Sequence, residues 1–243
     1  MMPCLYNPKQ IHPDWHPILD QAILTLDPNY LHQLTIDNHW LPGKESLFAA
    51  FTAPLSSIRY ILLGESPYPR AQSANGYAFW DRAVGSLWSS TGLSKPVNRA
   101  TSLRHFIKML LHARGDLKDD FSQDAIAKLD HAAYLQTASQ LFGALMAHGI
   151  LLLNASLVYS EGNIPYHARQ WRPFMQSLLL QLADYNPVLE LILFGRVAAQ
   201  VREASRFKCL IAEHPYNISF ITNPDVVAFF KPMDLLSSSH EKK

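Results

Sequence analysis

An acidic side chain and a hydroxyl side chain stand next to each other in a tight turn of this chain. Glu65 and Ser66 lie between Gly64 and Pro67, directly after the apolar run at residues 60–63. The run predicts a buried strand, and the Gly and Pro predict a turn at its carboxyl end. Since α/β sheets place ligands at the carboxyl ends of their strands, we expect acid–base or nucleophilic chemistry at this turn.

One interpretation of this turn is the nucleophile elbow of a serine hydrolase, with Ser66 as nucleophile and His214 as base. Two features oppose it. Tyr68 occupies the position of the elbow's final glycine, and Pro67 lacks the N–H that would donate to an oxyanion. A metal site is no better supported, because the 11 histidines show no HExxH or cysteine-pair spacing. The sequence therefore predicts no metal and no cofactor.

Polar residues also follow the other apolar runs, which lie at residues 150–153, 189–194 and 208–212. Parallel strands bring such residues to one edge of a sheet. An Asn amide both donates and accepts, so it can match a pyrimidine edge. The residues that follow the four predicted strands are Glu65, Ser66 and Tyr68, then Asn154, then Gly195, then His214.

Helical periodicity separates these strands, which indicates an α/β fold. We predict a three-layer α/β/α architecture with a central, mostly parallel, four-stranded sheet in a single domain over residues 1–243. The polar segment 237–243 is predicted to be a frayed tail. Helices are predicted at residues 14–34 (one or two), 102–113 with Ser102 as the cap, 125–147, 172–183 and 196–204.

Composition narrows the function classes further. The chain has 243 residues, is 48% apolar, and carries 21 Lys and Arg against 20 Asp and Glu. No apolar stretch reaches the roughly 18 residues that cross a bilayer, so we expect a cytoplasmic protein with no membrane partner. The two cysteines, Cys4 and Cys209, are too few for a four-cysteine cluster and are expected to be a terminal thiol and a buried strand residue.

Positive charge is nevertheless concentrated locally. Residues 82–115 contain no acidic residue and six Lys or Arg, and residues 162–183 contain Arg169 and Arg172 without an acidic residue. Such surface suits a phosphate backbone, although a solvated helix face is the plain alternative.

Several motifs in order resemble those of the uracil-DNA glycosylase superfamily, and of its family 1 in particular. The resemblance covers most of the chain, from the Trp15-His16-Pro17 block onward. Its motifs are Gly64-Glu65-Ser66-Pro67-Tyr68, Gly76-Tyr77-Ala78-Phe79, Lys95-Pro96-Val97 to Ser102-Leu103, Leu151-Leu152-Leu153-Asn154, Gln170-Trp171-Arg172-Pro173-Phe174 and His214-Pro215-Tyr216-Asn217-Ile218-Ser219.

The resemblance implies roles for the base-binding residues. His214 would hydrogen-bond the carbonyl oxygen where negative charge grows, and Asn154 would contact uracil N3–H and O4. Phe79 would stack on the flipped base, and the ring of Tyr68 would exclude the methyl group of thymine. The alternatives are structural: a turn before proline for His214, a turn cap for Asn154 and a core position for Phe79.

The resemblance also implies DNA contacts. Ile218 would wedge into the base stack, although as an isolated Ile it would be assigned to the core. Pro96 and Ser102 would belong to a loop that touches DNA. Gly195 and Arg196 replace a Gly-Ser phosphate clamp, so Arg196 would hold a phosphate by charge or obstruct the backbone.

The first motif departs from family 1, which has Gln-Asp where this chain has Glu65-Ser66. A neutral serine cannot replace the carboxylate that positions water, so Glu65 is the candidate base. Its Gly-Glu-x-Pro pattern resembles family 4, whose iron–sulfur cluster two cysteines exclude here. We therefore expect a monomer that excises uracil from single- or double-stranded DNA. The alternatives are a DNA- or protein-binding module of the same fold and a glycosylase for another deaminated base.

Overall fold

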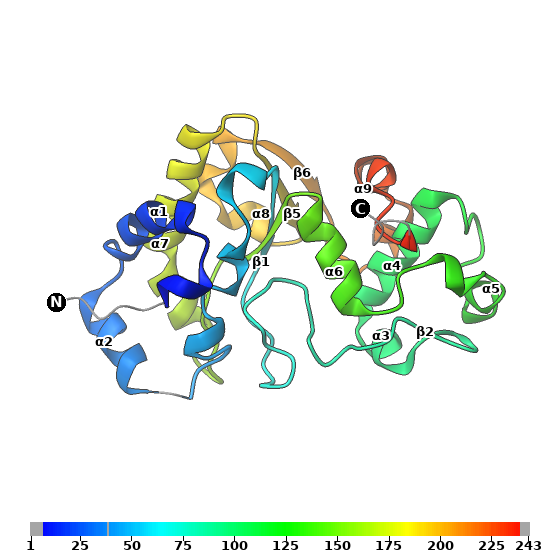
Figure 1. The fold of residues 1–243 in the computed structure, drawn as a ribbon, viewed down its shortest axis with the longest axis horizontal. Helices are drawn as coiled ribbons and strands as arrows, with labels where there is room; N and C mark the ends of the chain where they lie inside the picture. The colour runs from blue at the N-terminus through cyan, green and yellow to red at the C-terminus, as the bar shows by residue number, and fades with distance from the viewer. Residues whose placement is uncertain (1–6, 38, 239–243) are drawn as a thin grey trace. The chain divides into compact units, whose positions relative to one another are not determined.

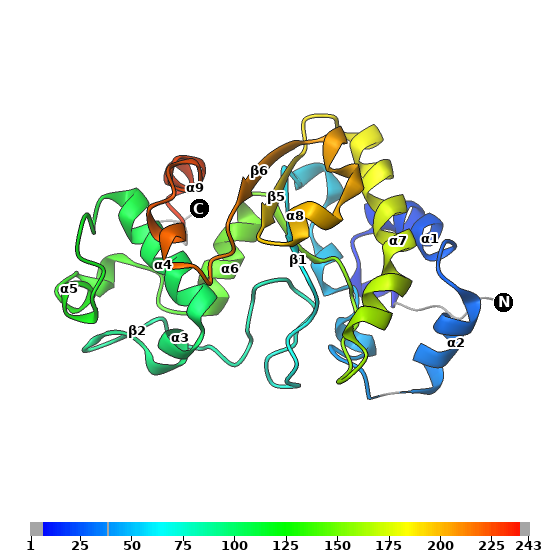
Figure 2. The same cartoon turned by 180° about the vertical axis from the view of Figure 1, so that it is seen from behind.

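Four strands form the main sheet, and its order explains which motifs share an edge. The computed structural model describes residues 7–37 and 39–238, and Figures 1 and 2 show it from two sides. The sheet order is β4-β1-β5-β6, with β4 and β5 both parallel to β1. The strands are β1 (Tyr60–Gly64), β4 (Ile150–Asn154), β5 (Glu190–Phe194) and β6 (Lys208–Ala212).

The register of β1 and β4 aligns the ends of two predicted motifs. Gly64, the last residue of β1, pairs with Asn154, the last residue of β4. Every residue of β4 and the last four of β1 are buried, as expected for strands covered on both faces. The parallel arrangement thus brings the turn after β1 next to the turn after β4.

The strand β6 differs from the other three. It lies at one end of the sheet order, and Ile211 is 59% exposed. The prediction of a buried run at residues 208–212 was therefore right about the strand and wrong about its burial. Cys209, expected to be buried, is only partly so, and Cys4 lies outside the described residues.

The chain groups into two units, which we describe separately. The first comprises residues 1–81, 149–193 and 197–209, and the second comprises residues 82–148, 194–196 and 210–243. The single domain expected over residues 1–243 stays a prediction.

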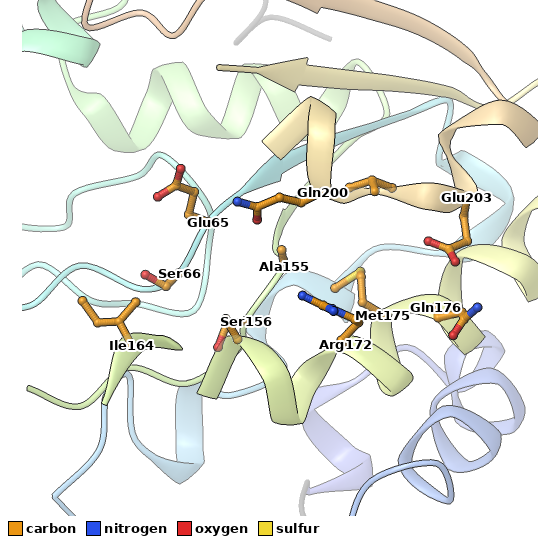
Figure 3. A pocket seen from close by; sticks show the side chains of 12 residues that line it. Glu65, Ser66, Ala155, Ser156, Ile164, Arg172, Met175, Gln176, Gln200 and Glu203 are labelled. Atoms are coloured by element: carbon orange, nitrogen blue, oxygen red, sulfur yellow. The ribbon is translucent and has the colours of Figure 1, made fainter. Parts of the chain in front are cut away.

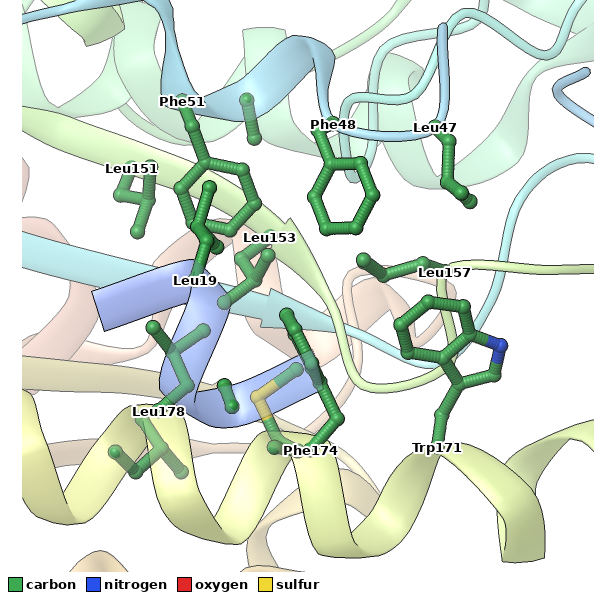
Figure 4. Packing of buried hydrophobic residues seen from close by; sticks show 14 of the residues in the cluster. Leu19, Leu47, Phe48, Phe51, Leu151, Leu153, Leu157, Trp171, Phe174 and Leu178 are labelled. Atoms are coloured by element: carbon green, nitrogen blue, oxygen red, sulfur yellow. The ribbon is translucent and has the colours of Figure 1, made fainter. Parts of the chain in front are cut away.

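Aromatic and aliphatic side chains fill the core of the first unit (Figure 4). Trp171 and Phe174 of α7 (Ile164–Tyr185) are both fully buried, with ring centroids 5.0 Å apart. Phe48 packs on Phe174 at 6.0 Å, and leucines of β4 complete the cluster. Since each large apolar side chain contributes about 1.5–3 kcal/mol on burial, this cluster fixes α7 firmly on the sheet.

The helices predicted at residues 14–34, 102–113 and 196–204 are present with shifted ends, whereas the helices Lys95–Arg99 and Pro224–Phe230 were not predicted. Residues 14–34 form two helices, as expected, because Asp27 caps the second through its carboxylate. The α-helices other than α7 are α1 (His16–Ile23), α2 (Pro28–Ile36), α3 (Lys95–Arg99), α4 (Thr101–Arg114), α5 (Gln123–Ala127), α6 (Ala138–Ala147), α8 (Val197–Gln200) and α9 (Pro224–Phe230).

Three local predictions were wrong. Residues 125–147 are not one helix, because a capping box of Thr137 and Gln140 starts α6 afresh after a break. Ser102 does not cap α4, whose N-cap is Ala100 without a side-chain bond. Ser237 is not frayed, since its N–H donates to the Asp234 carbonyl. Residues 239–243 of the predicted tail lie outside the described part of the chain.

A short hairpin of β2 (Trp88–Ser89) and β3 (Gly92–Leu93) was not predicted. Gly92 has φ +109, and a Cβ there would lie 2.7 Å from the Gln123 carbonyl oxygen. The turn therefore requires glycine.

Candidate active site

The turn after β1 is bonded to the turn after β4. The Ala155 N–H donates to the Gly64 carbonyl over 2.8 Å, and the Ser156 N–H donates to the Glu65 carbonyl over 3.0 Å. These bonds hold the backbone of Glu65 while its side chain is exposed. Within residues 7–37 and 39–238, the Glu65 carboxylate has no ion pair and no hydrogen bond. It is therefore available to accept a proton.

Glu65 and Ser66 line a pocket of about 180 Å³ in the first unit (Figure 3). Figure 3 places Glu65 and Ser66 at one end of this pocket and Gln176 and Glu203 at the other. Tyr68, Phe79 and Asn154 are not among its lining residues. The full lining is Glu65, Ser66, Ala155, Ser156, Ile164, Ala168, Arg172, Met175, Gln176, Gln200, Val201 and Glu203.

Asn154 ends β4 with its side chain almost completely enclosed. The residue is only 2% exposed, and a Cβ built on Gly64 would lie 2.6 Å from its Oδ1. The missing side chain of Gly64 therefore leaves the space that the Asn154 amide occupies. A buried amide beside a strand end is a fixed donor and acceptor pair, which suits recognition of a flat polar edge.

Phe79 lies in a strained segment that reaches the same strand ends. Its φ of +62° falls in the left-handed region, which L-residues rarely adopt. The preceding Ala78 donates its N–H to the Leu152 carbonyl over 3.2 Å, and a Cβ on Gly64 would lie 3.0 Å from the Ala78 Cβ. The half-buried ring of Phe79 is thus carried by a backbone that packs on β1 and β4. Strain of this kind is typical of functional sites.

Tyr68 supports that segment directly. Its hydroxyl donates to the Phe79 carbonyl oxygen over 3.2 Å. Burial raises the pKa of Tyr68 to about 12, so the hydroxyl keeps its proton and remains a donor. The structure therefore joins Tyr68 to Phe79, and Asn154 to Gly64, within the first unit.

In the second unit, the backbone fixes the tautomer of His214. The Tyr216 N–H donates to Nδ1 of His214 over 3.1 Å. Because a backbone N–H can only donate, Nδ1 must accept, and the neutral ring carries its proton on Nε2. His214 is thus set up as a hydrogen-bond donor through Nε2.

Gly195 lies against the same histidine. Its φ is +67°, and an added Cβ would lie 2.9 Å from the Cβ of His214. The Gly195 N–H donates to the Ala212 carbonyl over 2.9 Å, which ties the end of β5 to the end of β6. The structure therefore places Gly195 beside His214, while the roles predicted for these two residues stay predictions.

His105 of α4 supports the turn that follows His214. Its Nδ1 lies 2.9 Å from the carbonyl oxygen of Pro215. Burial lowers the pKa of His105, and the nearby Arg104 and Lys108 lower it further. His105 was missed in the sequence, since a histidine inside a helix gives no sign of a contact 110 residues away.

The predicted DNA-contacting residues differ in exposure. Ile218 is 76% exposed, so it is not a core residue, and the neighbouring Tyr216 is 67% exposed. Pro96 in α3 and Arg196 are exposed as well, whereas Ser102 is half-buried within α4.

Neither a metal site nor a membrane-spanning helix is found among the residues that the structure describes. No group of His, Cys, Asp or Glu in the described ranges could hold a metal ion. No helix built from those residues has both the length and the apolar character needed to span a bilayer.

No protein-family model matches the chain, but curated relatives align with most of its length. A uracil-DNA glycosylase of Corynebacterium glutamicum is 26% identical over 222 residues, which cover 86% of this chain and 81% of that protein. A uracil-DNA glycosylase of Leuconostoc mesenteroides is 24% identical and covers 86% and 84% of the two chains.

Solved structures give a stronger match. The UNG crystal structure from Nitratifractor salsuginis is 41% identical, covers 95% of both chains and has a TM-score of 0.90. The mimivirus uracil-DNA glycosylase, at 17% identity and a TM-score of 0.58, shares the fold. The predicted three-layer α/β/α class with a parallel four-stranded sheet is confirmed. With a relative this similar along nearly its whole length, the chain belongs to the uracil-DNA glycosylase superfamily.

Proposed function

We propose that this protein removes uracil from DNA by hydrolysing the N-glycosidic bond. Relatives named uracil-DNA glycosylase span most of the chain, which supports the reaction class. The observation that carries the chemistry is the tautomer of His214, whose Nδ1 accepts the Tyr216 N–H. A neutral imidazole with its proton on Nε2 is a suitable donor to a base oxygen that gains negative charge.

Each step has a candidate residue. The base is flipped out of the stack, and the N1–C1′ bond breaks with its electron pair going to uracil. His214 donates a hydrogen bond to the uracil oxygen that gains charge. Water then forms the new bond to C1′, and Glu65 accepts the proton that the water loses. Glu65 then releases its proton to solvent, and the uracil anion takes up a proton from solvent. The products are free uracil and an abasic site.

Base recognition is assigned to the first unit. Asn154 would bind the polar edge of uracil with its buried amide, and Phe79 would stack on its face, a contact worth about 1–3 kcal/mol. Tyr68 would exclude a 5-methyl group. Ile218 would take the place of the flipped base, since its side chain is 76% exposed.

The remaining contacts are with the phosphate backbone. Pro96, Ser102, Gly195 and Arg196 are proposed to contact DNA, either single- or double-stranded. A cytoplasmic monomer that works without metal or cofactor stays a prediction.

The test is single-turnover release of free base from a single-stranded oligonucleotide with one uracil, at high enzyme. His214→Ala serves as the blank. Release that vanishes in the blank would support the proposal. No release above the blank, with DNA still bound, would contradict it and favour a binding module or a glycosylase for a different base.

A second comparison tests which residue acts as the general base toward water. Glu65→Gln should lower the rate by at least about tenfold, because water loses its proton acceptor. Glu203→Gln is the matched control, since Glu203 lines the same pocket. Ser66→Ala should retain most activity. If Ser66→Ala abolished activity while Glu65→Gln retained it, Ser66 rather than Glu65 would be the catalytic residue.

A further inference from the structure

Two side-chain bonds tie the turn after β1 to the segment that carries Phe79. The Tyr68 hydroxyl donates to the Phe79 carbonyl over 3.2 Å, and Nη2 of Arg70 donates to Oδ2 of Asp81 over 3.0 Å. Each bond joins residues 11 apart in the sequence. The two segments therefore lie side by side and are joined by two neighbouring hydrogen-bonded pairs, Tyr68 with Phe79 and Arg70 with Asp81.

The Arg70–Asp81 bond is not an ordinary surface ion pair. The side chain of Asp81 is 6% exposed, whereas that of Arg70 is 57% exposed. A carboxylate removed from water needs a compensating cation, and leaving it without one is costly. Arg70 thus places a positive charge, from the solvent side, against the enclosed Asp81 carboxylate.

The Arg70–Asp81 bond neighbours the Tyr68–Phe79 bond, so we infer that the Asp81 carboxylate is an alternative acceptor for the Tyr68 hydroxyl. A phenol has a single O–H to donate, and a carboxylate is a stronger acceptor than a peptide carbonyl. After burial, Asp81 is the main cause of the raised pKa of Tyr68, and Arg70 opposes it, so all three groups interact. By pairing with Asp81, Arg70 weakens this competition and leaves the hydroxyl on the Phe79 carbonyl.

The bond to Phe79 matters because Phe79 is strained. A residue with φ +62° keeps that conformation only where its surroundings hold it, at a cost of about 1–3 kcal/mol. The Tyr68 hydroxyl holds the Phe79 carbonyl itself. If that hydroxyl turned to Asp81, the Tyr68 ring would move and the Phe79 carbonyl would lose this hydrogen bond.

We propose that Arg70 and Asp81 form a positioning pair for base discrimination. By neutralising Asp81, Arg70 keeps Tyr68 bonded to Phe79 and so fixes the two aromatic rings that border the base. The inference rests on the proposed function for its effect on uracil, but the hydrogen-bond exchange at Tyr68 is a property of the chain itself.

The test uses three variants: Arg70→Ala, Arg70→Lys and the double variant Arg70→Ala/Asp81→Asn. The readout is the single-turnover rate on uracil and on thymine in the same oligonucleotide. Arg70→Ala should lower the uracil-to-thymine rate ratio by about tenfold or more. Arg70→Lys should restore the ratio, because the cation returns. The double variant should also restore it to within a few-fold, because the competing carboxylate is gone.

The double variant separates this inference from a purely structural role. If the Arg70–Asp81 ion pair merely held the segments together, removing both partners would lower the rate ratio at least as much as removing Arg70 alone. Arg206→Ala is the matched control, since Arg206 pairs over 2.6 Å with Asp184, an exposed carboxylate. That variant should leave the ratio unchanged.

Two outcomes would overturn the inference. One is an unchanged ratio in Arg70→Ala, and the other is a double variant as impaired as the single one. If the unchanged ratio came with uniformly weaker DNA binding and a shallower salt dependence, Arg70 would be a phosphate contact.

A crystal structure of Arg70→Ala tests the inference independently of activity. The Tyr68 hydroxyl should lie on Asp81. If it stays on the Phe79 carbonyl, the inference fails even if the wild-type protein excises uracil. If the hydroxyl moves while the wild-type protein releases no uracil, the proposed function fails and the positioning pair stands.

Discussion

Gly64 and Asn154 end neighbouring parallel strands in register, and the glycine leaves room for the amide. A Cβ on Gly64 would lie 2.6 Å from Oδ1 of Asn154 and 3.0 Å from the Cβ of Ala78. The first contact is closer than real Cβ atoms approach other atoms, and Asn154 is 2% exposed and has little room to withdraw. One glycine therefore determines where the amide and the segment leading to Phe79 can lie.

Gly64→Ala should lower the single-turnover rate on uracil by about tenfold or more, because the displaced amide no longer matches the base edge. The rate is compared with that of Gly143→Ala, a glycine in α6 with no atom within 4 Å of an added Cβ. The control should fold at least as well as the wild type, since alanine favours helix. Equal rates in the two variants would remove Gly64 from the site.

Asn154→Asp should weaken uracil recognition, because an amide N–H₂ donor is replaced by an acceptor oxygen. The measurement is the ratio of excision rates for uracil and cytosine in matched oligonucleotides, at saturating enzyme. The ratio should fall, mainly through a slower reaction on uracil. Kinetics identical to the wild type would sink the assignment of Asn154 to the base pocket.

Gly195→Ala should impair His214. Alanine at φ +67° costs about 1–2 kcal/mol, and its Cβ would lie 2.9 Å from the His214 Cβ. Gly162→Ala separates the two effects, because Gly162 has φ +75° but no atom within 4 Å. Both variants should melt at lower temperature, and only Gly195→Ala should lose activity. If both lose activity equally, backbone strain alone explains the result.

Local patterns predicted the elements well where the cause is local. The apolar runs located all four strands of the main sheet. For β1, β4 and β5 the reason is that strands covered on both faces need continuous apolar residues, whereas β6 is partly exposed. The break within residues 125–147 also has a local cause, the Thr137 and Gln140 capping box, which was overlooked in favour of helical periodicity. The start of α7 at Ile164 was missed by eight residues, since Pro173 inside it suggested a helix start.

The site was predictable only in part, because its geometry depends on contacts between distant segments. The sequence identified residues that follow the strand ends, including Asn154, Gly195 and His214, but not the contact between Gly195 and His214. The positive φ of Phe79 was not predicted from the sequence, because phenylalanine rarely adopts this conformation. The Arg70–Asp81 pair was also missed, since the segment between these residues is irregular and has no periodicity from which a contact could be predicted.

A buried relay in the first unit predicts how stability depends on pH. The indole N–H of Trp171 donates to the Tyr30 hydroxyl over 2.9 Å, and that hydroxyl lies 2.8 Å from Nδ1 of His167. Tyr30 can donate its single proton only to Nδ1, so Nε2 of His167 carries the ring proton toward Ser160, at 2.7 Å. A second ring proton would displace the Tyr30 proton from its acceptor.

Burial lowers the pKa of His167, while Asp37 acts weakly in the opposite direction. Because the folded pKa lies below the unfolded value of about 6.5, the unfolded chain binds more protons in between. This contribution to stability is therefore fully present above about pH 6.5 and is lost as the pH falls from there through the lower folded pKa. His105, whose pKa is also lowered, contributes in the same direction.

His167→Gln should lower the melting temperature at pH 7.5, since the relay loses its centre, but should flatten its decline between pH 7 and 5. The flattening is partial, because His105 remains. His32→Gln, at an exposed histidine, is the control and should keep the wild-type slope. If His167→Gln keeps the full wild-type slope, His167 is not the group whose protonation destabilises the fold, and the hydrogen-bond directions assigned to the relay are wrong.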